Sequence, residues 1–122
     1  MAAALDWYLK LDDLRGDADA QGFQNWFDVH SWKFAPGSLK ALPGRRQEVT
    51  IDMVTGPARA RLVSAMQTRH KFIPARLQGD NSNLGGESHP FVGLRVLSIK
   101  PGGLNRNRKV LEEVTFEVNS PG

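Results

Sequence analysis

The sequence predicts a mainly β protein whose strands roll into a small barrel or a tight sandwich, with a single helix. Most of the chain consists of short segments in which apolar and polar residues alternate, as they do in strands with one buried face. Only one segment has apolar residues at helical spacing. The length of 122 residues and the hydrophobic content of 40% suit one compact domain over residues 1–122.

The first expected strand is LDWYLKL at 5–11, where apolar and polar residues alternate. One of its faces carries only large apolar side chains, those of Leu5, Trp7, Leu9 and Leu11. The polar segment DDLRGDADAQG that follows is rich in turn-forming residues and is typical of a loop.

The second expected strand, FDVHSWKF, carries large apolar groups on both faces. Strict alternation places Phe27, Val29 and Ser31 on one side, and His30, Trp32 and Phe34 with Asp28 on the other. A strand that covers one core needs only one apolar face. We therefore expect the second face to pack against another molecule, because a chain this short has one core.

A long loop and the only helix come next. Residues 35–46 contain two Pro-Gly dipeptides, and QEVTIDMV at 47–54 alternates again. In TGPARARLVSAMQTRH, Thr55 is a candidate N-cap and Pro57 suits the first helical turn. Apolar side chains at helical spacing mark the buried side of this helix: Ala58, Leu62, Ala65 and Met66.

The last part of the chain is again extended. An irregular or edge strand is expected over 72–78 because it contains Pro74. A turn-rich loop at 79–90, a strand at 91–100, a basic loop at 101–109 and a strand at 111–118 follow. The sum is about six strands, with the helix between the third and the fourth.

Composition excludes several classes of protein. Without cysteine there is no disulfide, zinc–thiolate site or cysteine nucleophile. No apolar run approaches the roughly 20 residues that cross a bilayer, so no membrane insertion is expected. The N-terminal MAAALDWYLK lacks the basic start and apolar region of a secretory signal.

Charge is unevenly distributed along the chain. Residues 1–30 hold six acids, whereas no acid stands between Asp52 and Asp80, where five bases occur. Separate solvated faces would explain this pattern. A sharper interpretation is an acidic and a basic surface that attract copies of the chain head to tail.

No catalytic constellation is evident. The three histidines are scattered, and no nucleophile elbow, phosphate-binding loop or dinucleotide-binding glycine pattern occurs. Residues 17–28 loosely match a calcium-binding loop, but strands flank them where that motif requires helices. The bases lack interleaved aromatic residues, so specific nucleic-acid binding is not expected. We therefore expect a protein that is no enzyme and binds no metal or cofactor.

Taken in order, several segments resemble the Hcp family, the haemolysin-coregulated proteins that form the inner tube of bacterial type VI secretion systems. DWYLKLDDLRGDA is similar to the family's first strand and turn, and FDVHSWKF to its second strand with a Ser-Trp-x-aromatic pattern. QEVTIDMV, PARARLVSAMQTRH and FIPARLQ follow the family's order of strand, helix and strand. FVGLRVLSIK and LEEVTFEV are similar to its last long strands, so the resemblance spans nearly the whole chain.

This resemblance implies a small β-barrel of two sheets with a single α-helix at its side. It implies rings of six copies that stack into a tube inside a contractile sheath, with a spike protein at the end and effector proteins as cargo. The subunit would be cytoplasmic before assembly and would then be secreted through the injection apparatus without a signal peptide.

Roles for individual residues follow as hypotheses. The barrel core should contain Phe27 and Val29 together with Leu9, Ile51, Val96 and Phe116. The expected subunit interface comprises Trp32, Phe34, Leu39, Lys40, Leu42, Arg45 and Arg46. A basic surface for ring or partner contacts comprises Arg59, Arg61, Arg69 and Lys71.

Other functions stay open at this point. The tube protein of a phage-tail-like contractile injection particle shares the implied architecture. The chain could instead be a monomeric β-barrel that binds a ligand or peptide among its spare aromatic residues, and a hydrolase is a weaker third option. The mass of the native particle separates a ring from a monomer.

Overall fold

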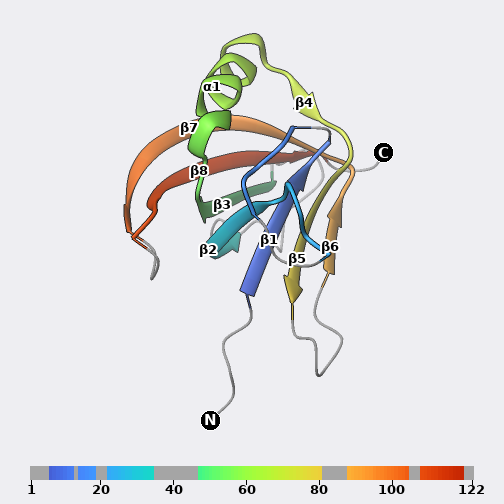
Figure 1. Ribbon diagram of the computed structural model, residues 1–122. Helices are drawn as coiled ribbons and strands as arrows, with labels where there is room; N and C mark the ends of the chain where they lie inside the picture. Colours follow the sequence, from blue (N-terminus) through green and yellow to red (C-terminus); the bar gives the residue numbers. More distant parts are fainter. Residues whose placement is uncertain are drawn as a thin grey trace.

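The computed structural model describes residues 6–12, 14–18, 22–34, 47–80, 88–104 and 108–119 (Figure 1). The strands are β1 (Asp6–Leu11), β2 (Phe27–Phe34), β3 (Gln47–Met53), β4 (Lys71–Phe72), β5 (Ala75–Asp80), β6 (Ser88–Phe91), β7 (Gly93–Leu104) and β8 (Val110–Asn119). The α-helix is α1 (Arg59–Thr68), and a short 3-10 helix, η2 (Gly56–Ala58), leads into it.

The strands form one antiparallel sheet in the order β4-β7-β8-β3-β2-β1-β5-β6. The two ends of this order meet. β4 and β5 are consecutive parts of one interrupted strand, and β6 and β7 are consecutive parts of another. These two interrupted strands pair with each other and form a bent two-stranded ribbon. The pairs Phe72–Leu94 and Ala75–Phe91 keep one register across the interruption. Since β7 also pairs with β8, and β5 with β1, this bent ribbon closes the sheet into a barrel.

The predicted mainly β fold with one helix is confirmed, with one difference. The two expected sheets are two layers of a single sheet, in which the long β7 and β8 curve over the layer that contains β1 and β5 (Figure 1). Six continuous strands make the barrel once β4–β5 and β6–β7 are each counted as one. The strand count expected from alternation therefore holds.

A corner formed by Ile73, Pro74, Val92 and Gly93 lies where the ribbon bends. A Cβ atom placed on Gly93 would be 2.8 Å from Cγ1 of Ile73. Real Cβ atoms do not approach other atoms so closely, so glycine at this bend leaves room for the side chain of Ile73.

Two expected loops are shorter than their sequences indicate. β6 begins at Ser88 and β7 continues to Leu104, so parts of 79–90 and 101–109 are strand. β7 keeps pairing with β8 beyond the Pro-Gly-Gly segment, through Pro101–Glu112 and Leu104–Val110. Cross-strand pairing thus overrides the local turn signal.

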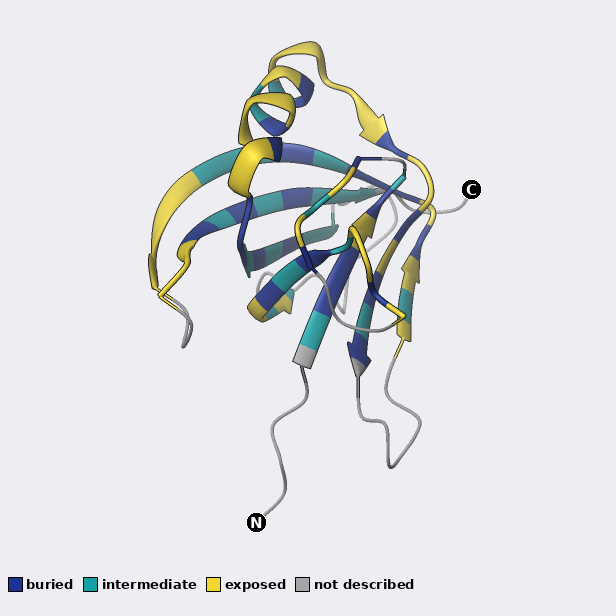
Figure 2. Cartoon of the chain, in the orientation of Figure 1, coloured by how far each residue is buried: buried dark blue, intermediate teal, exposed yellow. Residues whose placement is uncertain are grey.

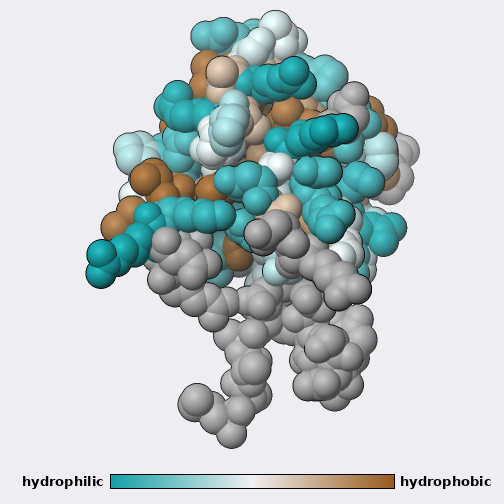
Figure 3. Space-filling view, viewed as in Figure 1, coloured by the Kyte–Doolittle hydropathy of each residue, from teal (hydrophilic) through white to brown (hydrophobic). Residues whose placement is uncertain are grey.

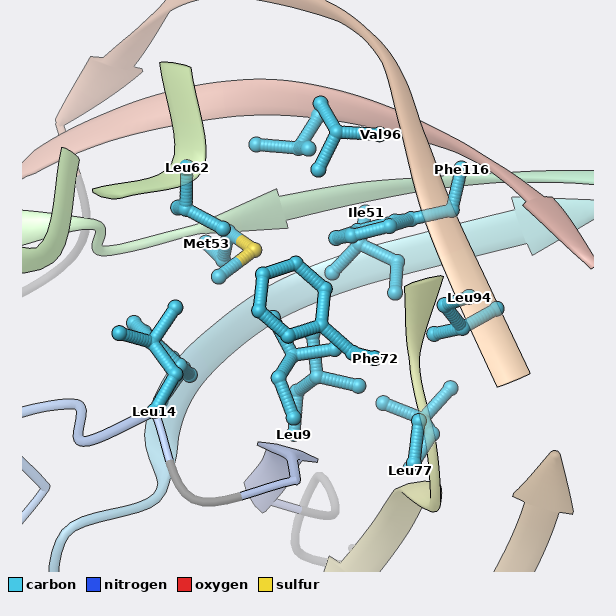
Figure 4. Close-up of a cluster of buried hydrophobic side chains, with 14 of the residues drawn as sticks. Leu9, Leu14, Ile51, Met53, Leu62, Phe72, Leu77, Leu94, Val96 and Phe116 are labelled. Carbon is cyan, nitrogen blue, oxygen red and sulfur yellow. The ribbon is translucent and has the colours of Figure 1, made fainter. Parts of the chain in front are cut away.

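The core occupies the barrel interior. Leu9, Phe27, Ile51 and Phe116 are completely buried, and Val96 is nearly so, as the sequence predicts. Figure 4 shows Leu9, Ile51, Phe72 and Phe116 converging from different strands, with Leu62 reaching in from α1. Figure 2 shows the outer side of α1 exposed, while Leu62 and Ala65 are buried.

The start of the helix differs from expectation at one residue. Thr55 makes no side-chain cap, and the chain enters α1 through η2, whose first turn holds Pro57. The buried Thr55 hydroxyl instead donates a hydrogen bond to Oε1 of Glu112 on β8. Nε of Arg59 donates to Oε2 of the same carboxylate at 2.9 Å. Glu112 therefore pins the base of the β7–β8 hairpin to the helix entry.

A second, smaller apolar cluster lies outside the barrel. Tyr8 projects from β1 and stacks on Phe23 with 4.4 Å between ring centroids, and Trp26 packs edge-on against Phe23. The connection from β1 to β2 brings these residues together, because Gly16 and Ala18 donate backbone hydrogen bonds to the carbonyls of residues 25 and 26. This connection therefore covers Tyr8 on the outer face of β1.

Candidate subunit interface

The two-faced interpretation of β2 is wrong, because the strand contains a β-bulge. Val29 pairs with Met53, but Ser31 pairs with Asp52, so His30 is an extra residue on β2. Beyond the bulge the side chains exchange faces. Trp32 then lies opposite Ile51 and Phe34 opposite Val49, which are core residues.

Trp32 and Phe34 consequently belong to the inner face of the barrel, near one of its ends. Both are half-buried and pack on the core. Trp32 meets Trp7 edge-on at 5.2 Å between ring centroids, and it also contacts His89 and Phe34. These four residues form an aromatic cluster, in which Trp32 and Phe34 are the members predicted to meet a neighbouring subunit.

The other expected interface residues are Leu39, Lys40, Leu42, Arg45 and Arg46, and they lie outside the described residues. Their role stays a prediction, and so does the role of Trp32 and Phe34 in binding a neighbour.

The expected basic surface is exposed. Arg59 and Arg61 lie on α1, Arg69 caps its end, and Lys71 begins β4. Arg59 is partly neutralised by its ion pair with Glu112. Arg69 ends the helix in the left-handed conformation, with φ of 58°. Glycine is the usual residue at this position, and placing an arginine in the left-handed conformation costs about 1 kcal/mol of folding free energy.

The outer face of the barrel is a polar ladder across three pairs of neighbouring strands. Ser31 on β2 donates to Asp52 on β3 at 3.0 Å, and the hydroxyls of Thr50 and Thr115 meet at 3.1 Å between β3 and β8. On the next pair, Arg95 on β7 forms an ion pair with Glu117 on β8 at 3.2 Å. An acid on β3 thus pairs with a hydroxyl on β2, and an acid on β8 pairs with a base on β7. The acids expected to form a separate acidic surface lie in residues 1–30 and not on this ladder, so that surface stays a prediction.

Candidate metal ligands are not brought together in the described part of the chain. Among these residues, no set of three or more His, Asp or Glu side chains could hold a metal ion. Asp28, one position of the loose calcium-loop match, instead lies 3.9 Å from the ammonium group of Lys109. No helix within the described ranges is long and apolar enough to cross a membrane.

Sequence reasoning missed the most exposed large apolar side chains among the described residues. Leu104 and Val110 lie near the end of the β7–β8 hairpin, and Ile73 and Val92 lie at the corner. Leu104 lies within the expected basic loop at 101–109 and Val110 directly follows it. Ile73 and Val92 lie at the bend of the ribbon, which the sequence did not predict. A signal that could have found the first pair is the apolar–basic composition of GGLNRNRKV, which contains two large apolar residues that an ordinary solvent loop does not need.

This closed antiparallel barrel with one lateral helix is the fold of Hcp proteins. No protein-family model and no curated protein sequence matches the chain. Solved structures do match it, 36 chains in all. The resemblance to Hcp noted from the sequence motifs is confirmed by these structures.

Among the matching structures is Hcp1 from Salmonella typhimurium, with a TM-score of 0.74, 21% identity, and coverage of 95% of this chain and 83% of that one. A type VI secretion system effector from Yersinia pestis has a TM-score of 0.75 and 15% identity, covering 93% of this chain and 84% of its own. The secreted protein Hcp3 from Pseudomonas aeruginosa has a TM-score of 0.66 and 15% identity, covering 93% and 85% of the two chains. At these identities the likeness establishes the fold.

Proposed function

We propose that this protein is a tube subunit of a bacterial type VI secretion system. Six copies form a ring, and rings stack into a tube that a contractile sheath surrounds and a spike protein caps. The role is structural and not catalytic. The observation that carries the proposal is the agreement with Hcp1 from Salmonella typhimurium over 95% of this chain and 83% of that one.

The dense packing inside the barrel supports a structural role. Its described interior is filled by large side chains such as Phe27, Phe72 and Phe116, which pack on one another in the core (Figure 4). A monomeric barrel that holds a ligand needs an open interior, so this packing favours a structural role. Cargo effectors would then travel inside the ring and outside the barrel of each subunit.

The proposal includes the route that the protein takes. The subunit is made in the cytoplasm and leaves the cell when the sheath contracts, with no membrane insertion and no specific nucleic acid as partner. The tube of a phage-tail-like contractile particle is the near alternative, and co-purification with sheath and spike proteins of a secretion cluster distinguishes the two.

The native mass tests the proposal directly. We expect a particle of about 81 kDa, six copies of the 13.5 kDa chain, in light scattering at micromolar concentration. Negative-stain micrographs should show annuli of one diameter. A particle that remains at 13.5 kDa across this range contradicts the proposal.

Trp32→Ala is expected to shift rings towards monomers. Truncating an interface anchor typically costs about 2 kcal/mol or more in binding free energy. Because Trp32 also packs on Trp7 and His89 within its own chain, the same change should lower the melting temperature of the monomer. Native mass and thermal unfolding are therefore measured together.

Trp7→Ala is the matched control, since it removes the same aromatic contact from the β1 side. Rings of the control should persist at concentrations where those of Trp32→Ala have dissociated. Equal dissociation of the two variants would mean that both act through the fold, and would remove Trp32 from the interface.

A further inference from the structure

The large apolar side chains that the described residues leave exposed form two separate pairs. Leu104 and Val110 are 61% and 65% exposed and are cross-strand partners, and we call them the tip. At the corner, Ile73 and Val92 are 51% and 45% exposed. In Figure 3 hydrophobic atoms gather at the left of the molecule, where Figure 1 places the end of the β7–β8 hairpin.

The tip and the corner lie at opposite ends of β7. The strand begins at Gly93, beside the corner, and ends at Leu104 after 12 residues. At about 3.3 Å per residue, its length is roughly 36 Å. Figure 1 shows the two regions on opposite sides of the molecule, so one chain cannot cover its own tip with its own corner.

The hairpin is held in a defined direction although its described residues near the tip are exposed to solvent. The described residues 100–104 and 108–110 are all exposed. Further from the tip, Thr55 and Arg59 bind the carboxylate of Glu112. Lys109, one of the exposed residues, lies 3.9 Å from Asp28 on β2. These contacts tie the base of the hairpin to the helix entry and to the barrel. An apolar pair presented on a preorganised ribbon loses little freedom when it binds.

We propose that the tip of one copy packs against the corner of a second copy, head to tail. The inference rests on the proposed function and names the surfaces that join neighbouring subunits. Two different patches far apart on one chain are what a heterologous contact requires, and such contacts close into a ring when the rotation between copies permits. The four side chains supply the apolar centre, around which a stable contact buries about 800 Å² on each partner.

Charge distinguishes this contact from an acid–base attraction. Arg108 and Lys109 flank the tip, and Lys71 and Arg76 stand on either side of the corner, all of them exposed. Asp12 is the described acid beside the corner, because its backbone N–H donates to the carbonyl of Pro74 at 2.8 Å. Asp28 lies 3.9 Å from Lys109 and offsets its charge, which leaves Arg108, Lys71 and Arg76 against Asp12, so like charges still outnumber opposite ones across the contact.

Rings held by the tip and the corner should consequently strengthen as salt rises. Between 0.01 M and 0.15 M the screening length falls from about 30 Å to about 8 Å, which weakens the repulsion between bases. Sulfate in addition favours apolar burial. Rings that dissociate as sodium sulfate is added would contradict an apolar contact.

Two double variants test the contact. One carries Leu104→Thr and Val110→Thr at the tip, the other Ile73→Thr and Val92→Thr at the corner. Threonine is β-branched, as three of the four replaced residues are, and this shape suits strands. Each variant alone should dissociate at a concentration about 30-fold or more above that of the unaltered protein. Ala60→Ser, an exposed apolar-to-hydroxyl change on α1, is the matched control and should leave rings intact.

Mixing the two double variants gives the decisive result. A mixture still contains one intact tip and one intact corner, so it should form heterodimers but no rings. Native mass spectrometry, with one variant labelled with ¹⁵N, identifies the heterodimer. Thermal unfolding verifies that each variant folds, and the single variants Val110→Thr and Val92→Thr replace a double variant that does not.

The outcomes separate this inference from the proposed function. If the unaltered protein forms rings and both variants do so equally well, the tip and corner are not the contact, and the ring proposal stands. If the corner variant still dimerises while the tip variant does not, copies join tip to tip and the head-to-tail contact is overturned. If the unaltered protein is a monomer throughout, the ring proposal itself fails.

Discussion

Phe116→Ala should lower the free energy of unfolding by about 3–5 kcal/mol, which is the usual loss when a buried phenylalanine is truncated. Phe116 is fully buried, and its neighbours across the sheet are Val49 on β3 and Val96 on β7. The side chain points from β8 into the barrel core, and the backbone ladders with β3 and β7 on both sides limit collapse of the cavity that truncation leaves. Urea denaturation followed by circular dichroism measures the loss.

Phe34→Ala is the matched control for this change. Phe34 also faces inward, but it is only half-buried near the end of the barrel. Water already reaches part of its ring, so we expect a loss of about 1–2 kcal/mol. Equal losses for the two variants would show that the barrel interior is no better packed than its end.

Gly16→Ala should destabilise the protein by about 3 kcal/mol, at the upper end of the usual cost of overpacking. A Cβ atom on Gly16 would lie 2.4 Å from the carbonyl oxygen of Trp26 and 2.8 Å from Cα of Phe27. Both are backbone atoms and cannot rotate away as a side chain would. The connection must therefore separate from the start of β2, and the stack of Tyr8 on Phe23 should loosen with it.

Near-ultraviolet circular dichroism reports the loss of that aromatic stack, and chemical denaturation reports the stability. Gly103→Ala is the control, because nothing lies within 4 Å of the position a Cβ would take there. Its effect should stay within about 0.5 kcal/mol. A Gly16 variant that is as stable as the control would mean that the two segments are not held in contact.

Alternation along single strands predicted most of the fold, because a barrel strand has one face towards the core. It identified Leu9, Phe27, Ile51 and Phe116 as core residues, and helical spacing identified the buried side of α1. These signals are local, since each depends only on the period of one element and the burial of one face.

The features that the sequence did not predict depend on contacts between distant segments. Nothing in FDVHSWKF shows that His30 is the bulged residue, because the bulge exists only relative to β3. One extra residue exchanges the faces of Trp32 and Phe34, which is why alternation placed them on the wrong side. Thr55 met every local requirement of an N-cap. Its hydroxyl instead donates a hydrogen bond to Glu112, which lies on a strand 57 residues further along the chain.

The candidate interface was predictable only in part. The exposure of Arg61, Arg69 and Lys71 follows from the polar side of the helix and the edge that follows it. The tip and the corner could not be found in this way. Leu104 is paired because β8 lies beside it, and Val92 is exposed because the ribbon bends at Gly93.

The bent ribbon also protects the protein against aggregation. Because β4–β5 and β6–β7 join the two ends of the sheet, β5 has hydrogen-bonded neighbours on both sides, in β1 and β6, and the first residues of β7 have them in β4 and β8. Exposed strand edges are the templates on which crowded β proteins fuse into amyloid-like deposits. Closure therefore leaves fewer open edges on which copies could pair at high concentration, and contacts through side chains can be made and broken without unfolding the chain.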